Sequence, residues 1–234
     1  MAEVPAPLAV PGSPPPDGGG RRRAGRPRNH DSDETRRLLL EVALDAFAEH
    51  GFDGVSTRNL ARLAQVTPTT LFHHFATKDE LYGAAYHHAV GLAYAHYRRA
   101  IVGQTTLVGE LRQLFAAADA ILAQRPAIAL LSVRVQIDQQ RPGLHVAHRP
   151  EAAVTFRQEM VQRAVARGEL EAADGVHVQR LLDVFLWGLS VIGYDDAQVR
   201  GESLRAIERF VEAVGPGSGT TKMQNGWPVG SAKA

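Results

Sequence analysis

The chain has 234 residues, which is enough for one large domain or two modest ones. Hydrophobic residues make up 44% of it, so most of the chain can bury a core, and a formal net charge of +1 points to no partner by itself. It contains no cysteine, which excludes disulfides, cysteine nucleophiles and thiolate metal sites. No apolar run approaches the roughly 18 residues of a membrane span, and the N-terminus lacks the pattern of a signal peptide. We therefore expect a cytoplasmic protein with no membrane contact.

Basic residues are concentrated near the N-terminus. Residues 1–20 are rich in Pro, Gly and Ala, with too little apolar surface to offset the entropy of ordering, so this leader is expected to be disordered. Residues 21–28 then read RRRAGRPR. Such a run is either an arm that contacts DNA phosphates or the minor groove, or a solvated basic tail or targeting patch. Because a helix-turn-helix pattern follows, we favour the arm, with Arg26 and Arg28 among its DNA contacts.

A helix is predicted from about residue 34 to residue 50, capped by Ser32 or Asp33. Gly51 stands where a left-handed C-terminal residue is wanted, and Phe52 can pack back against the last turn. Two short helices joined by a tight turn are then predicted in VSTRNLARLAQVTPTTLFHHF, residues 55–75. Ser56 caps the first of them, and Thr67-Pro68 opens the second, since proline suits a first helical position. This pattern is typical of a helix-turn-helix, which lays its second helix in the DNA major groove.

The outward face of the second helix carries groups that can read base edges. Threonine methyls can contact the thymine methyl, threonine hydroxyls can bond either donors or acceptors, and histidine can pair with guanine acceptors. Arg58 is the best candidate for a bidentate base or phosphate contact. Alternatively, His73 and His74 are ordinary surface residues at a helix C-terminus, where the helix dipole stabilises them.

The rest of the chain reads as helical, with no strand of useful length. A capping box at Thr77–Glu80 opens a long helix to about residue 100, and further helices are predicted at about 106–123, 126–139, 151–167, 174–192 and 202–214. The expected fold is all-α, with about nine helices. The expected units are a leader with a basic arm (1–30), a helix-turn-helix DNA-binding domain (31–82), a ligand-binding and dimerisation domain (83–215), and a disordered tail (216–234).

Residues 36–82 resemble the DNA-binding domain of the TetR (tetracycline-repressor) family of bacterial transcriptional regulators. The matching run is ALDAFAEHGFDGVSTRNLARLAQVTPTTLFHHFATKDEL, and the resemblance covers about a fifth of the chain closely. The later helices agree with the family's ligand-binding and dimerisation domain in number and order. The phrases ARGEL (residues 166–170) and WGL (residues 187–189) are also similar to what many members have there.

The resemblance implies DNA contacts from both helices of the motif, from its turn and from the start of the next helix: Ser56, Thr57, Arg58, Thr67, Pro68, Thr69, Thr70, Phe72, His73, His74 and Lys78. Two positions depart from the family pattern. Position 65 is usually glycine and is Gln65 here, so the turn must accommodate a side chain, with some strain. Position 72 is usually tyrosine, and Phe72 cannot donate a hydroxyl to a phosphate.

An effector pocket in a helical bundle should be lined by inward aromatic residues and a few polar groups. Our candidates, each of which could equally be plain core or surface, are Phe115, Arg134, Gln136, His145, Phe156 and Trp187. Small residues on the very apolar helix 174–192 allow close approach of a partner helix, or tight packing within the subunit. The resemblance implies that this helix and the last one build a four-helix dimer interface, with candidates Leu181, Phe185, Gly188, Leu189, Ile192, Ile207 and Phe210.

We therefore predict a homodimeric transcriptional regulator, a repressor, that reads a pseudo-palindromic double-stranded DNA operator and is released from it by an unknown small molecule. The alternative is a helical protein-interaction module with a weak or vestigial DNA-binding head; a sequence-specific footprint discriminates the two. No phosphate loop, nucleophile elbow or motif-like pair of acids indicates an enzyme. Without cysteines or a His-Glu-x-x-His run, no metal site is expected, and no cofactor is implied.

Overall fold

The computed structural model describes residues 28–140, 144, 146, 150–192 and 196–214. Within them it has no strand, which confirms the all-α prediction. The elements are α1 (Arg28–Gly54), α2 (Thr57–Leu63), α3 (Pro68–His74), α4 (Lys78–Ala100), α5 (Leu107–Gln124), α6 (Ala127–Asp138), α7 (Glu151–Ala166), the short 3-10 helix η1 (Ala172–Asp174), α8 (Gly175–Ile192) and α9 (Ala197–Val214). The expected leader, the expected basic arm (21–28) except Arg28, and the expected tail (216–234) lie outside the described residues.

Two helices differ from the prediction in their bounds. α1 begins at Arg28 and continues through a kink at Gly51, where φ is 70°, to Gly54. The positive φ at Gly51 agrees with the predicted left-handed residue, and Phe52 does pack back, with its ring 6.3 Å from that of Phe47. α9 begins at Ala197 rather than at residue 202, because the Asp196 carboxylate accepts the first free amides of the helix, from Gln198 at 2.8 Å and Val199 at 3.0 Å.

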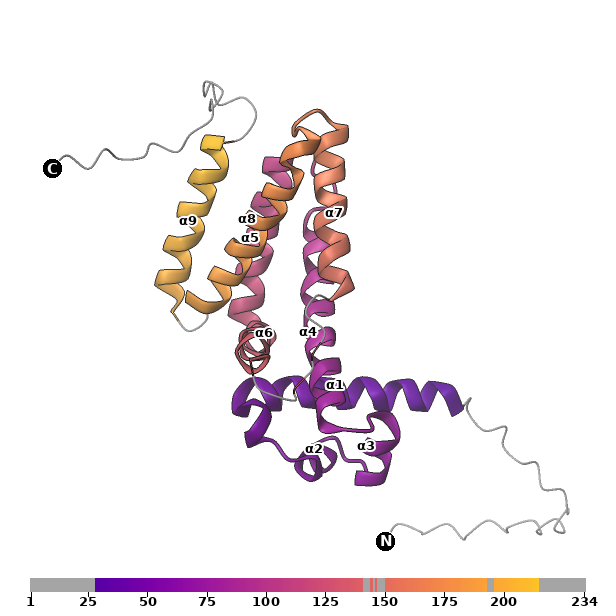
Figure 1. Ribbon diagram of the computed structural model, residues 1–234. Coiled ribbons are helices and arrows are strands. Elements are labelled where there is room, and N and C mark those ends of the chain that lie inside the picture. Colours follow the sequence, from indigo (N-terminus) through magenta and orange to yellow (C-terminus); the bar gives the residue numbers. More distant parts are fainter. Residues whose placement is uncertain (1–27, 141–143, 145, 147–149, 193–195, 215–234) are drawn as a thin grey trace, which may run out of the picture.

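The N-terminal helices form a small body beneath the bundle (Figure 1). α1 lies across the foot of α4, and α2 and α3 lie on its other side. Its core is fully buried and built from Phe47, Leu60, Leu71, Phe75 and Tyr82. The Tyr82 ring, from α4, meets the Phe47 ring edge-on at 4.8 Å, so α4 closes this core from above.

Helices α4 to α9 form the upper bundle, in which α4, α5, α7 and α8 run roughly along one another and α9 packs at one side (Figure 1). α6 is short and lies crosswise at the foot of the bundle, against α1. α7 is tied to α5 by a buried carboxylate: Glu110 is 1% exposed and accepts from Arg163 at 2.9 and 3.0 Å and from Arg167 at 3.1 Å. Two guanidinium groups thus compensate the desolvation of this acid.

The segment Ala172–Ile192, which ends in α8, is long and apolar enough to cross a membrane by length and composition alone. The sequence prediction that no stretch approaches this limit is therefore corrected. The pair Arg180 and Asp183 lies in the middle of the segment, with nitrogen and oxygen 3.9 Å apart. Only 17% of an 18-residue window of this segment is buried in the subunit, so several of its apolar side chains remain exposed.

Candidate nucleic-acid interface and ligand cavity

Two side-chain caps fix the ends of the short helices α2 and α3. The Ser56 hydroxyl accepts from the Asn59 amide at 3.1 Å, as predicted for the start of α2. The Thr67 hydroxyl accepts from the Thr70 amide at 3.1 Å and also lies 2.9 Å from the Thr70 hydroxyl. Because helices of one to two turns are marginal on their own, these caps and the buried Leu71 hold the pair in place.

The turn between α2 and α3 contains a strained residue. Gln65 has φ 56°, and among the described residues it is the one non-glycine position with a positive φ. Its backbone is nevertheless well bonded, since the Gln65 amide donates to the Arg62 carbonyl at 3.1 Å and the Val66 amide to the Ala61 carbonyl at 2.9 Å. The positive φ is the backbone conformation that favours glycine, so a side chain at this position is expected to cost some strain.

Several of the side chains predicted to contact DNA lie together on the outer surface of this pair. Thr57, Thr70, His74 and Lys78 are partly buried, and the remaining described ones are exposed: Ser56, Arg58, Thr67, Pro68, Thr69, Phe72 and His73. The inward positions Leu60, Ala61, Leu71 and Phe75 are buried. α3 therefore presents hydroxyl, imidazole and ring groups outward from a rigid base. The side chain of Arg28, and the whole of Arg26, lie outside what the structure describes.

Charged groups near α3 pack on aromatic rings. The Lys78 ammonium lies 4.4 Å from the centre of the Phe52 ring, and the Arg36 guanidinium 5.0 Å from that of Phe75. Burial, with smaller contributions from His73 and Arg36, lowers the pKa of His74 below its ordinary value. At neutral pH His74 is therefore uncharged, and its ring can both donate and accept hydrogen bonds.

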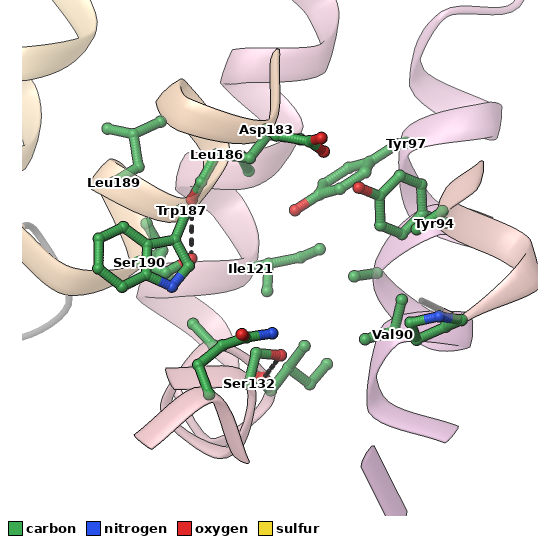
Figure 2. A pocket seen from close by; sticks show the side chains of 18 of the residues that line it. Val90, Tyr94, Tyr97, Ile121, Ser132, Asp183, Leu186, Trp187, Leu189 and Ser190 are labelled. Carbon is green, nitrogen blue, oxygen red and sulfur yellow. Dashed lines mark hydrogen bonds between the residues drawn. The ribbon is translucent and has the colours of Figure 1, made fainter. Parts of the chain in front are cut away.

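A cavity of about 540 Å³ lies inside the upper bundle (Figure 2). Helices α4, α5, α6, α7 and α8 all contribute to its walls. The lining is mostly apolar, and its polar members are Tyr86, Tyr94, Tyr97, Ser132, Gln136, Arg157, Asp183 and Ser190. This size and composition suit a small organic ligand.

The charged groups of the cavity wall are paired with each other. Arg157, on α7, is 7% exposed and donates to the Tyr94 hydroxyl of α4 at 3.0 Å. Its guanidinium also lies 3.1 Å from the Asp183 carboxylate of α8. Burial raises the pKa of Tyr94 above its ordinary value, against the opposite effect of Arg157, so the hydroxyl keeps its proton at neutral pH. The pair joins three helices at one point of the wall.

The floor of the cavity is bonded to the N-terminal body. α6 supplies Ile128, Ala129, Ser132 and Gln136 to the cavity wall. From the same helix Arg134 donates to the backbone carbonyls of Ala48 at 2.7 Å and Glu49 at 3.0 Å, near the kink in α1.

Two further contacts join these parts of the molecule. The Tyr82 hydroxyl of α4 donates to the Asp138 carboxylate of α6 at 2.7 Å. Glu41 of α1 bonds both Arg125, just before α6, and His88 of α4, the latter at 2.7 Å. Arg125 and Arg134 therefore attach the cavity floor to α1, the helix that supports α2 and α3, and Asp138 attaches it to α4.

The outer faces of α8 and α9 carry exposed apolar side chains. On α8 these are Val176, Leu181, Val191 and Ile192, together with Val184 and Trp187, which also line the cavity, and on α9 Phe210. Their exposed fractions run from 40% at Val191 to 63% at Val184, which is unusual for so many large apolar groups on two adjacent helices.

Comparison with known proteins identifies the N-terminal body. The family model for "Bacterial regulatory proteins, tetR family" matches residues 39–85. An HTH-type transcriptional repressor of Mycobacterium tuberculosis is 35% identical over 98 residues, which are 40% of this chain and 49% of that protein, so the chain spans about half the length of this relative. The N-terminal body is a DNA-binding domain of the TetR family.

Solved TetR-family structures extend the likeness of the fold beyond that body. A TetR transcriptional regulator from Chloroflexus aurantiacus has a TM-score of 0.63 at 17% identity, over 78% of this chain and 96% of that one. A transcriptional regulator chain from Saccharomonospora viridis, solved in complex with choline, has a TM-score of 0.61 at 17% identity, over 77% and 96% of the two chains. At such identities the comparison establishes the fold of both parts, and nothing about ligands.

Only some of the residues predicted for the effector pocket line the cavity. Gln136 and Trp187 do line it. Phe115 does not line it, and its ring lies 6.0 Å from that of Phe185. Phe156 lies behind the cavity tyrosines, 5.3 Å from the Tyr94 ring. Arg134 points away to α1, and His145 lies outside the described residues.

The predicted dimer residues also divide between two faces of α8 and α9. Leu181, Ile192 and Phe210 are exposed, and Phe185 and Gly188 are partly buried. Leu189 is 2% exposed and lines the cavity, and Ile207 is 8% exposed. The last two are therefore removed from the set, because they are already buried within the subunit.

Sequence reasoning missed the cavity residues Tyr94, Tyr97, Arg157 and Asp183. A usable signal existed for two of them: Tyr94 and Tyr97 stand three apart on the long helix and so share one of its faces. Arg157 and Asp183 gave no such signal, since they belong to different helices.

We predict that Gln65→Gly stabilises the protein. Glycine adopts a positive φ without the steric cost of a Cβ, so the free energy of unfolding should rise by about 1 kcal/mol in urea titrations. The matched control is Gln65→Ala, which keeps the Cβ and should give no such gain. If both variants are equally stable, the φ at Gln65 carries no strain.

Proposed function

We propose that this protein is a sequence-specific, DNA-binding transcriptional regulator, and that it is a repressor released from its operator by a small molecule. The observation that carries the proposal is the capped pair α2 and α3, which presents Arg58, Thr69 and His73 on one outer surface. The TetR-family domain supports DNA binding, and the name of the Mycobacterium tuberculosis relative supports repression.

On this proposal α3 enters the major groove. Thr69, Thr70, His73 and the neutral His74 would read base edges, while Arg58 of α2 makes a bidentate contact with a guanine or a phosphate. Ser56, Thr57, Thr67 and Pro68 would position the backbone against phosphates, with Phe72 packing at the groove edge and Lys78 near a phosphate. The basic arm would add affinity without specificity. Each phosphate that it neutralises would make the slope of log binding constant against log salt concentration more negative by about 0.9.

We propose that the working form is a homodimer built on α8 and α9. The exposed Leu181, Ile192 and Phe210 give this pair of helices an apolar outer face that a second copy would cover. Two copies related by a two-fold axis would place two α3 helices about 34–36 Å apart, in successive major grooves of a pseudo-palindrome.

We propose that the cavity holds the effector and that α6 transmits its binding. α6 forms part of the cavity wall and is bonded through Arg134 to α1. α1 in turn supports the reading head, by which we mean the helix pair α2 and α3. A ligand that prefers one position of α6 or α4 would favour one distance between the two α3 helices of the dimer. Operator binding would change the affinity for the ligand by the same factor as the ligand changes the affinity for the operator. The choline complex of the Saccharomonospora viridis chain supports a ligand role for this fold.

The first test concerns DNA contacts. DNA selected from a random library by the wild-type protein is titrated in a gel-shift assay. We expect Arg58→Ala to weaken binding by about 10- to 100-fold, the loss of one bidentate contact. Arg99→Ala, an exposed arginine at the far end of α4, is the matched control and should bind as the wild type. Equal affinity of both variants would remove Arg58 from the interface, and recovery of no preferred sequence would remove the proposed function.

The second test concerns the dimer. Leu181→Arg places a charge in the centre of the proposed interface, so we expect a monomer by light scattering at micromolar concentration, and weaker operator binding. Val102→Arg is the control, because Val102 is 75% exposed just after α4 and lies on neither α8 nor α9. A Leu181→Arg protein that remains a dimer would contradict this interface.

The third test concerns coupling through α6. Operator binding should slow amide hydrogen exchange in Ala127–Asp138 of the wild type, since a helix bonded to α1 is stabilised when α1 is held. Arg134→Met keeps the aliphatic stem and removes both bonds to α1. We expect it to bind the operator while losing most of that protection. Arg99→Met serves as the control, and unchanged protection in Arg134→Met would contradict the route.

A further inference from the structure

The wall of the cavity contains a tyrosine hydroxyl that makes no hydrogen bond to the described residues and is accessible from the cavity. Tyr97 is 8% exposed, and no hydrogen bond is made to its hydroxyl by the residues that the structure describes. Its ring is held by Tyr94 at 5.2 Å and Phe156 at 6.3 Å. Figure 2 shows Tyr94 and Tyr97 reaching from α4 across the cavity towards α8. A ligand acceptor in the cavity could therefore take the proton of this hydroxyl without displacing a bond within the protein.

This hydroxyl is a hydrogen-bond donor at every physiological pH. Burial raises the pKa of Tyr97 well above its ordinary value, with a smaller contribution from Tyr94. Tyr94 offers a second donor nearby, because its oxygen accepts from Arg157 and its own proton remains available.

The described residues that line the cavity carry no net charge. Apart from the tyrosines, its ionisable lining groups among the described residues are Arg157 and Asp183, and their charges cancel at 3.1 Å. A charged ligand would lose its hydration without gaining a counter-charge, unless it broke this pair. The wall therefore favours an uncharged molecule.

Much of the remaining wall is apolar, and its two serines are already bonded; Tyr86, Gln136 and Trp187 are its other polar-tipped residues. Val90, Ile121 and Leu186 supply apolar surface. The hydroxyl protons of Ser132 and Ser190 are donated to the carbonyls of Ile128 and Leu186, each at 2.9 Å (Figure 2). Neither serine therefore competes with Tyr97 as a donor.

We propose that the cavity binds an uncharged, largely apolar molecule that carries a carbonyl-type acceptor, of the ketone, ester, lactone or amide class, and that Tyr97 donates to this acceptor. The proposal rests on the proposed function in taking the cavity as the effector site, and it adds the chemical class of the effector. Tyr97 is thus a specificity-determining residue, with Tyr94 beside it.

Four probes with one diphenylmethyl skeleton test the proposal: benzophenone, diphenylmethane, diphenylacetate and diphenylmethylammonium. Binding to the full chain is measured by calorimetry, and irradiation of bound benzophenone locates it by cross-linking to α4 and α8. We expect benzophenone to bind about three- to tenfold more tightly than diphenylmethane, the gain of one hydrogen bond. The two charged probes should bind about 100-fold more weakly than benzophenone.

The variant Tyr97→Phe should abolish the preference for benzophenone over diphenylmethane and leave the affinity for diphenylmethane unchanged. Tyr82→Phe removes another buried hydroxyl of α4, outside the cavity, and should leave the preference intact. A preference that survives in Tyr97→Phe, tighter binding of either charged probe, or binding of none of the four overturns the proposal. DNA binding is titrated separately, so loss of the regulator function would be seen without affecting this result.

Discussion

One uninterrupted helix, α4, is shared by the two halves of the molecule, and the rest of the structure depends on this. Its first turns bury Tyr82 in the core beneath, where the ring meets Phe47. Its later turns place Tyr94 and Tyr97 in the cavity wall. Because a helix of 23 residues is stiff, displacement at the cavity end must be accommodated at the other. The domain boundary expected at residue 82 falls inside α4, so the two halves of the molecule share one continuous helix.

Two features of the structure favour glycine at the kink in α1, position 51. Its φ of 70° favours glycine, and a Cβ there would lie 3.2 Å from a guanidinium nitrogen of Arg134. The same kink ends the first part of α1 and leaves the Ala48 and Glu49 carbonyls free to accept from Arg134. The chain therefore ends a helix, admits a side chain from α6 and bonds the two parts at a single place. Substitution of Gly51 would disturb all three together.

What the sequence predicted well was local, and what it missed was tertiary. The caps at Ser56, Thr67 and Thr77 follow from side-chain chemistry within one turn, and all three are present. Tyrosine faces could not be assigned by periodicity, because its ring suits a core and its hydroxyl suits a polar wall. Arg134 shows the same limit: its position on a helix was predictable, but the direction of a long side chain depends on neighbours distant in sequence. The family resemblance supplied the candidate DNA-contacting residues and could not supply the cavity.

α8 has two faces with different demands, and this constrains how the proposed regulator works. Its inner face places Asp183 against Arg157 and Leu189 in the cavity wall, while its outer face exposes Leu181 and Ile192. A ligand that changed the packing of the inner face would alter the outer face as well, since a helix moves as a unit. The Arg157 bond to Tyr94 carries the same displacement to α4. Ligand, partner subunit and reading head would then be coupled through packed helices, without any change in net charge.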